Sequence, residues 1–379
     1  MRVFRTDRNL RLLLGALLFW MLGVGLYEGL IPIYARQLGA SPVQLGGLFT
    51  LRNLALAGGF LIGWAVADRI SRRTLMFASW FFGLPVPLML AAAPTYLWLL
   101  PGLLLYELTY FALPAIHAYI TERVPPSELA SAFGAMGTVT SVGFLVSPAL
   151  GGIIADRWGI RVVLVVAFLL FLLSTILVLR VEQSGPGTMP AAGPRRLVLS
   201  DLAPAVPALL IYVGITFMML ITVPFLPPFL REVRDISLSE IGVLGSMQAL
   251  GAVLLTPVAG RLGDRLGHAP TMVGQIGVWT SGILLTAYAP APLLPVGAAL
   301  RCRSPLTTLA QAMVGASAPP AILGRTFALA GMLSAVLAAA GSFAGGYAYR
   351  ADPTYPLLIS VGTAVLLWVA LLSRSNRRG

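Results

Sequence analysis

Residues 63–73 read GWAVADRISRR, and residues 260–268 read GRLGDRLGH. When the chain is shifted by 196 positions, Asp68-Arg69 falls on Asp264-Arg265. Each stretch is a short charged turn between long apolar runs. A repeat at so long a distance indicates that the chain consists of two related halves.

Further matches support the duplication. At shifts of 196 or 194 positions Pro32 falls on Pro228, Pro125-Pro126 on Pro319-Pro320, Phe133 on Phe327, and Gly151-Gly152 on Gly345-Gly346. Residues 182–200 are rich in proline and glycine and predict a flexible linker. We therefore expect an N-terminal six-helix half over 1–181, a cytoplasmic linker over 182–200 and a C-terminal six-helix half over 201–379. Duplicated halves of this kind place a solute site between them, near the membrane midplane.

The composition predicts an all-α membrane protein. The 379 residues are 58% hydrophobic and 11% charged, with a mean hydropathy of +0.86, whereas a soluble domain carries roughly 25% charged residues. One membrane helix needs about 20 apolar residues, so the chain has room for about twelve. The predicted spans are 9–35, 42–67, 73–93, 95–121, 127–155, 160–180, 201–230, 237–262, 270–289, 292–317, 321–349 and 354–373.

The basic residues predict the orientation. All 26 are arginine, in short clusters between apolar runs, which argues against nucleic acid as the partner of the net charge of +12. With the N-terminus inside, 17 arginines lie in cytoplasmic segments, 6 in external ones and 3 within spans. This bias predicts a multi-pass protein of the inner membrane with both termini in the cytoplasm. The N-terminal apolar run continues to about Ile33, so we expect a first membrane helix and not a cleaved signal peptide.

The two charged turns resemble the loop signature of the major facilitator superfamily, G-x-x-x-D-R-x-G-[RK]-[RK]. The second copy keeps both glycines of the signature; the first has Trp64 and Ser71 at those positions but keeps the basic pair. The resemblance implies that the aspartates meet the N-termini of helices 11 and 5, where the dipole is positive, and latch the two halves on the inside. The latch residues would be Asp68, Arg69, Arg72, Arg73, Asp264 and Arg265.

The fifth predicted span resembles the helix-5 signature of the drug and proton antiporters of that superfamily, G-x8-G-x3-G-P-x2-G-G. The matching residues are Gly134, Gly143, Ser147, Pro148, Gly151 and Gly152, with serine in place of one glycine. Small residues allow close helix packing, so we expect a tight, rocking seam between the two halves here, with Pro148 bending the helix. The fourth span, by contrast, lacks the arginine that those antiporters carry in its apolar body.

Five charged residues lie in the interior of predicted spans, away from their ends, where each costs at least ~2.5–3.5 kcal/mol. Glu28 and Glu107 are the candidate proton carriers, since a buried carboxyl is protonated more easily near neutral pH. Arg52, Arg301 and Arg303 are their candidate partners. The repeat places Glu107 opposite Arg301 or Arg303, so we expect a pair whose breakage couples solute or proton binding to rocking of the halves. The alternative is a static pair that only holds helices in register.

In this superfamily helices 1, 4, 7 and 10 line the central cavity. Its candidate solute contacts in this chain are Tyr27, Tyr106, Tyr110, Phe217, Gln248 and Gln311. Aromatic groups with few charges favour an amphiphilic or aromatic solute over a sugar.

The leading hypothesis is a secondary transporter that exports small amphiphilic compounds by alternating access, coupled to protons. The alternatives are a facilitator or symporter of a small metabolite and, more remotely, a non-transporting sensor on the same fold. An enzyme is not expected, because no nucleophile–base set is seen and the two histidines, His117 and His268, are far apart. Without lysine there is no phosphate-binding P-loop. We expect no cofactor and no metal, and a monomer in the bilayer.

Overall fold

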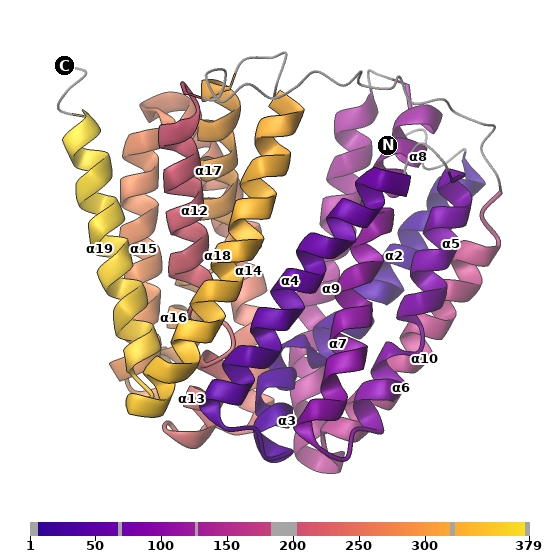
Figure 1. Cartoon of the computed structure of the whole chain (residues 1–379), viewed down its shortest axis with the longest axis horizontal. Helices are drawn as coiled ribbons and strands as arrows, with labels where there is room; N and C mark the ends of the chain where they lie inside the picture. Colours follow the sequence, from indigo (N-terminus) through magenta and orange to yellow (C-terminus); the bar gives the residue numbers. More distant parts are fainter. Residues whose placement is uncertain (1–6, 67–69, 126–127, 183–202, 319–322, 376–379) are drawn as a thin grey trace. The chain divides into compact units, whose positions relative to one another are not determined.

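The computed structural model describes residues 7–66, 70–125, 128–182, 203–318 and 323–375 (Figure 1). Throughout these ranges the regular structure is helical, with no strand. The first six predicted spans correspond to α2 (Arg8–Tyr27), η1 (Glu28–Leu30) and α3 (Ile31–Gln37); α4 (Pro42–Val66); α5 (Arg72–Gly83) and α6 (Val86–Ala91); η2 (Tyr96–Trp98), α7 (Leu99–Leu108), η3 (Thr109–Ala112) and α8 (Leu113–Arg123); α9 (Leu129–Trp158); and α10 (Ile160–Leu179).

The C-terminal part of the chain repeats this order except at its third span, which is one continuous helix. Its elements are α12 (Val206–Leu220) and α13 (Leu226–Glu232); α14 (Leu238–Leu266); α15 (His268–Tyr288); η5 (Ala291–Leu293), α16 (Leu294–Leu300) and α17 (Ser304–Ser317); α18 (Leu323–Ala351); and α19 (Tyr355–Ser375). Nine helices among the described residues are long and apolar enough to cross a membrane. The other three predicted spans, at α12–α13, α15 and α16–α17, are also helical.

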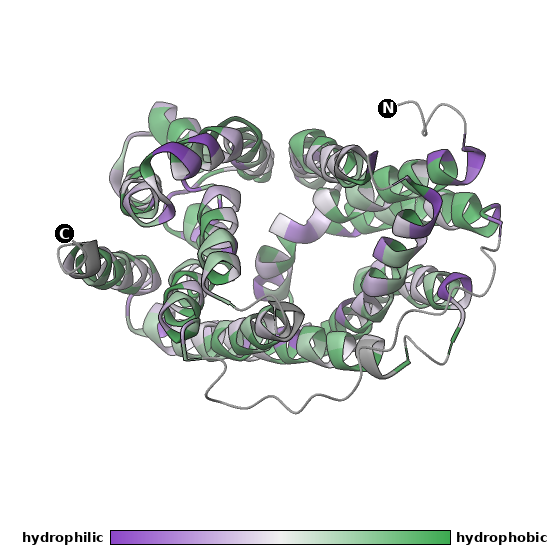
Figure 2. Ribbon diagram, turned by 90° about the horizontal axis from the view of Figure 1, so that it is seen from above, coloured by the Kyte–Doolittle hydropathy of each residue, from purple (hydrophilic) through white to green (hydrophobic). Residues whose placement is uncertain are grey.

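Helix α10 shows why lipid is the solvent of this fold. Val163, Leu164 and Phe171 are buried, whereas Leu169 and Leu179 on the opposite side are exposed. A helix that is apolar on all sides is stable only where its outer face meets hydrocarbon. Figure 2 shows the same pattern in most other helices, which are drawn mainly in the green of apolar residues.

The contacts divide the chain into two compact units. Unit 1 comprises 1–39, 54–193 and 237–242, and unit 2 comprises 40–53, 194–236 and 243–379. The first part of α4, up to residue 53, therefore belongs to unit 2, whereas the rest of α4 belongs to unit 1. Conversely, the start of α14, up to residue 242, belongs to unit 1 and the rest of it to unit 2. The start of α14 packs on α9, where Asp156 accepts hydrogen bonds from the amides of Leu238 and Ser239 at 3.3 and 3.2 Å. The start of α4 packs on α18, where Thr50 donates to the Ala339 carbonyl at 3.0 Å. Most of the predicted linker, 183–200, lies outside the described residues, and the predicted boundaries of the halves stay a prediction.

Five spans that the sequence predicts as continuous helices are interrupted instead. One break lies at 84–85, between α5 and α6 in the third predicted span. The other four lie at 28–30, 109–112, 221–225 and 301–303, in the first, fourth, seventh and tenth predicted spans. In each of these four cases the next α-helix has proline as its second residue: Pro32, Pro114, Pro227 and Pro305. Proline has no N–H to donate to the carbonyl four residues earlier, which interrupts the helical hydrogen bonds there. Two of the carbonyls affected belong to Glu28 and Arg301.

Unit 1 is packed around α2, which lies against α9 and α10. At Gly151 of α9 a Cβ would collide with the backbone of Leu26, and at Gly143 it would lie 2.7 Å from Met21 Cβ. The glycines thus let the α9 backbone touch α2, as small residues do in membrane helix pairs.

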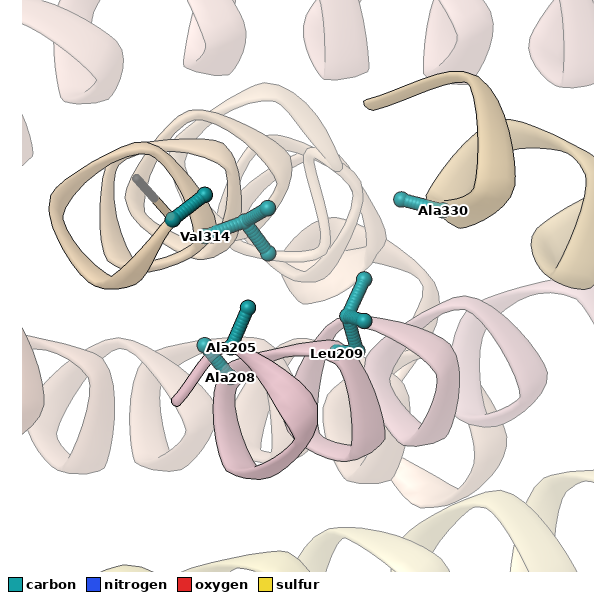
Figure 3. Close-up of a cluster of buried hydrophobic side chains, with 6 residues drawn as sticks. Ala205, Ala208, Leu209, Val314 and Ala330 are labelled. Atoms are coloured by element: carbon teal, nitrogen blue, oxygen red, sulfur yellow. The ribbon is translucent and has the colours of Figure 1, made fainter. Parts of the chain in front are cut away.

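Unit 2 is held by small residues where α12, α17 and α18 meet. Figure 3 shows part of this buried cluster. Its members are Ala205, Ala208, Leu209, Val314, Ala318 and Ala330. Short side chains allow close helix approach, which is the main source of packing energy between helices in lipid.

Candidate functional site

An aromatic recess in unit 1, open on one side, is the first candidate site. It is built from α2, α5, α7, η3 and α8 and lined by Leu17, Trp20, Met21, Ser79, Trp80, Tyr106, Thr109, Tyr110, Leu113 and Ile116. Its wall is mainly apolar, and Ser79, Thr109 and two tyrosines contribute hydroxyl groups. Such a lining suits an apolar or aromatic part of a solute.

Trp20 lines this recess, and three other aromatic side chains hold its ring in place. It stacks on Phe171 of α10 at a centroid distance of 3.8 Å. Trp80 lies tilted at 5.5 Å, and Tyr106 is parallel at 6.5 Å. Tyr110 meets Tyr106 edge-on at 6.1 Å. Aromatic pairs of this geometry contribute about 0.5–1.5 kcal/mol each beyond their buried area.

Ser174 of α10 fixes the second tryptophan. Trp80 Nε1 donates to Ser174 Oγ at 2.8 Å, and Ser174 Oγ donates to the Ala16 carbonyl at 2.6 Å. This relay joins α5, α10 and α2 with buried groups. A buried indole N–H needs such a partner, so the serine sets the angle of the ring that lines the recess.

Replacing Ser174 by alanine is expected to lower the free energy of unfolding by about 1–3 kcal/mol, because the Trp80 N–H is left buried without a partner. The measurement is the melting temperature of the purified protein in detergent. Ser281→Ala is the matched control, since Ser281 is exposed and bonds only within its own helix, to the Gly277 carbonyl of α15. Equal melting temperatures for the two variants would disprove the role of the relay.

Both predicted proton carriers lie at helix breaks beside this recess. Glu28 begins η1 and is half-buried, whereas Glu107, next to last in α7, is 4% exposed. Tyr27 and Trp20 both meet the Phe171 ring, at centroid distances of 6.5 and 3.8 Å. Trp20 is in turn parallel to Tyr106, and Tyr110 meets Tyr106 edge-on. The fold of unit 1 therefore gathers two carboxyls and three phenols that the sequence predicted on two separate helices. Broken helices at corresponding positions are typical of ion and solute sites in transporters.

Arg301 is the buried cation of unit 2. It closes α16, is 9% exposed, and donates from Nη1 to Gln248 Oε1 of α14 at 3.1 Å. The structure thus joins two residues that the sequence named separately, one as a charge partner and one as a solute contact.

The remaining predicted residues lie in more varied surroundings. Arg303 and Gln311 are exposed, and Phe217 is half-buried. The guanidinium of Arg52 lies 5.4 Å from the centre of the Phe49 ring on the same helix. The Glu107–Arg301 or Glu107–Arg303 pair stays a prediction.

The predicted latch is described only in part. Asp68 and Arg69 lie outside the described residues, and Asp264 and Arg265 are exposed near the end of α14. The other two residues make contacts inside unit 1. Arg72 forms an ion pair with Glu122 at the end of α8, and the Arg73 guanidinium lies 4.6 Å from the centre of the Phe77 ring.

The predicted helix-5 residues fall into two groups. Gly143, Ser147 and Gly151 face α2 within unit 1, and Gly152 meets residues 238–242. Gly134 is exposed, and a Cβ there would meet nothing within 4 Å. The tight contact predicted from the motif is therefore between α9 and its neighbours in unit 1. Pro148 lies inside the continuous helix α9.

Sequence reasoning missed the two recess tryptophans and Ser174. A signal was present, because Trp20 and Trp80 lie well inside their spans, whereas membrane tryptophans gather at the interfaces. It also missed a polar network near the ends of α2, α8 and α10: Asp7 accepts from Arg123 Nη1 at 3.3 Å, and Tyr119 donates to the Glu182 carbonyl at 3.2 Å.

Comparison with known proteins agrees with this architecture. The family model of the Major Facilitator Superfamily matches residues 12–222 and 208–378. The multidrug resistance protein MdtG of Klebsiella pneumoniae is 28% identical over 282 residues, which cover 69% of this chain and 67% of the relative. The multi-drug resistance efflux pump PmrA of Streptococcus pneumoniae is 28% identical over 287 residues, which cover 71% and 70%.

Solved structures share the fold at low sequence identity. The nucleoside transporter NupG matches with a TM-score of 0.77 and 16% identity, over 96% of this chain and 98% of that one. A bacterial homologue of the human lysosomal transporter Spinster matches with a TM-score of 0.74 and 17% identity, over 97% and 96%. The apolar helices, the breaks and the family match lead to one conclusion: the chain belongs to the Major Facilitator Superfamily and is a multi-pass membrane transporter.

Proposed function

We propose that this transporter exports small amphiphilic compounds from the cytoplasm in exchange for protons. The observation that carries the proposal is the position of Glu28 and Glu107 at two helix breaks, each next to a tyrosine of the ring cluster around an aromatic recess. The recess offers an apolar solute a surface, and the carboxyls offer protons a place to bind. The relatives named for multidrug efflux support the direction and the class of solute.

In this proposal Glu28 carries the proton, and Glu107 forms an ion pair with Arg301 or Arg303 that breaks and reforms during each cycle. The charged turns at 68–73 and 264–265 latch the two halves on the cytoplasmic side. The chain works as a monomer in the inner membrane, with both termini in the cytoplasm as its arginines favour.

The test uses purified protein in liposomes that contain a trapped pH dye. Amphiphilic cations, neutral drugs and metabolites are added in turn, with the wild type beside Glu28→Gln. We expect an amphiphilic solute to move protons in the wild type and not in the variant, because glutamine keeps the shape of the side chain but cannot carry a proton. Solute flux without proton movement would favour a facilitator instead and return Glu28 to a structural or solute-binding role.

A further inference from the structure

Arg301 has an unusual environment for a charged residue in a membrane. Arg301 and Glu107 are the two charged side chains that are buried among the residues whose side chains the structure describes. Arg301 belongs to unit 2 and Glu107 to unit 1. A buried guanidinium is stable only where its charge and its five N–H groups are matched by partners.

The backbone before Arg301 is held between two helices. At Gly251 of α14 a Cβ would collide with the Ala299 carbonyl, and at Gly282 of α15 it would lie 2.6 Å from the Arg301 nitrogen. The Arg301 amide donates to the Gly297 carbonyl at 3.1 Å. The arginine is therefore placed by packed backbone on both sides, which is the rigidity that a binding residue needs.

The partners of Arg301 within unit 2 do not balance its charge. Gln248 is a neutral acceptor, and Nε is buried without a hydrogen-bond partner. A second cation, Arg303, follows two residues later in the chain and adds no negative charge to balance it. In the described part of unit 2 no carboxylate is bonded to Arg301.

The N-terminus of α17, the helix that follows Arg301, adds to the positive electrostatic potential around this arginine. Helix α17 begins directly after Arg303, and no side chain caps its N-terminus. The free N–H groups of a helix start favour an anion, and half-helix N-termini meet anionic solute groups in other transporters. A planar carboxylate can accept two parallel hydrogen bonds from one guanidinium. The Nε and one terminal nitrogen of Arg301 could donate these two bonds.

We propose that Arg301, oriented by Gln248, binds a carboxylate or another acidic group of the transported solute. The inference rests on the proposed transport function and narrows it to amphiphiles that carry an acidic group.

The test is equilibrium dialysis of the full-length protein in detergent with three probes of one shape: 2-naphthoate, 2-naphthalenemethanol and 2-naphthylmethylammonium. We expect the wild type to bind the acid at least about tenfold more tightly than the alcohol, as a charged hydrogen bond supplies. Arg301→Gln should remove this preference. Gln248→Glu should also remove it while leaving the arginine in place, because the new carboxylate occupies the guanidinium. Arg350→Gln, at an exposed external position, is the control and should keep the preference.

Equal affinities for acid and alcohol in the wild type, or no binding of the acid, would overturn the inference. The inference would also be overturned if both Arg301→Gln and Gln248→Glu still bound the acid more tightly than the alcohol. The same holds if the wild type bound chloride but bound the acid no more tightly than the alcohol. Flux of the alcohol in liposomes tests transport separately. Flux without acid preference contradicts this inference alone, and acid preference without flux of any probe contradicts the transport proposal alone.

Discussion

Glu107→Gln is expected to reduce solute-driven proton movement to the level of liposomes without protein. Glu107 is 4% exposed at the end of α7, where the fourth span breaks. A charge at such a place costs at least ~2.5–3.5 kcal/mol on insertion scales, so the cycle must use its protonation or its pairing to offset that cost. Glutamine has the same shape and can neither lose a proton nor balance an arginine.

The measurement is the rate of internal pH change after a solute is added, over a range of external pH. Glu128→Gln is the control, because it removes one carboxyl that begins α9 and makes no side-chain cap bond. A melting temperature close to that of the wild type would show that Glu107→Gln is folded. Wild-type rates at every pH would return Glu107 to a purely structural role.

Gly151→Val is expected to prevent stable folding of unit 1. A Cβ at this position would collide with the Leu26 carbonyl, a backbone atom that cannot rotate away. Overpacking typically costs about 1–3 kcal/mol, and we expect at least that, because α2 would have to separate from α9 along its length. The affected residue is next to Tyr27 and Glu28, so the same shift would also displace the carboxyl at the break.

The measurement for this variant is the yield of monodisperse protein after detergent extraction, together with its melting temperature. Gly134→Val is the matched control on the same helix, because Gly134 is exposed and a Cβ there meets nothing within 4 Å. Equal yield and stability of the two variants would contradict the packing of α9 against α2.

The spans could be predicted from sequence because hydropathy is a local property of each segment. The run 160–180 is apolar throughout, and α10 occupies 160–179. The breaks could also have been predicted, since Pro32, Pro114, Pro227 and Pro305 each remove a donor at a known distance. Hydropathy alone predicts continuous spans there, because these prolines lie within apolar runs.

The site contacts depend on which helices become neighbours, and the sequence does not encode this locally. The Arg301–Gln248 bond joins α16 to α14, and the Trp20–Phe171 stack joins α2 to α10. The charged residues were found because each is costly in lipid, whereas Ser174 was missed because serine is common in membrane helices. The free-energy cost of a charge in lipid identified the candidate residues. Which of them are in contact follows only from how the helices pack in the folded protein.

The central claim is exchange of a solute for protons, and uphill movement tests it most directly. The protein is placed in liposomes with an acidic interior, and the solute is a probe that binds but does not itself titrate. The account predicts that the probe accumulates inside above its external concentration as protons leave, and that a protonophore abolishes the accumulation. Equilibration without accumulation, or accumulation only when the exterior is the acidic side, would contradict it.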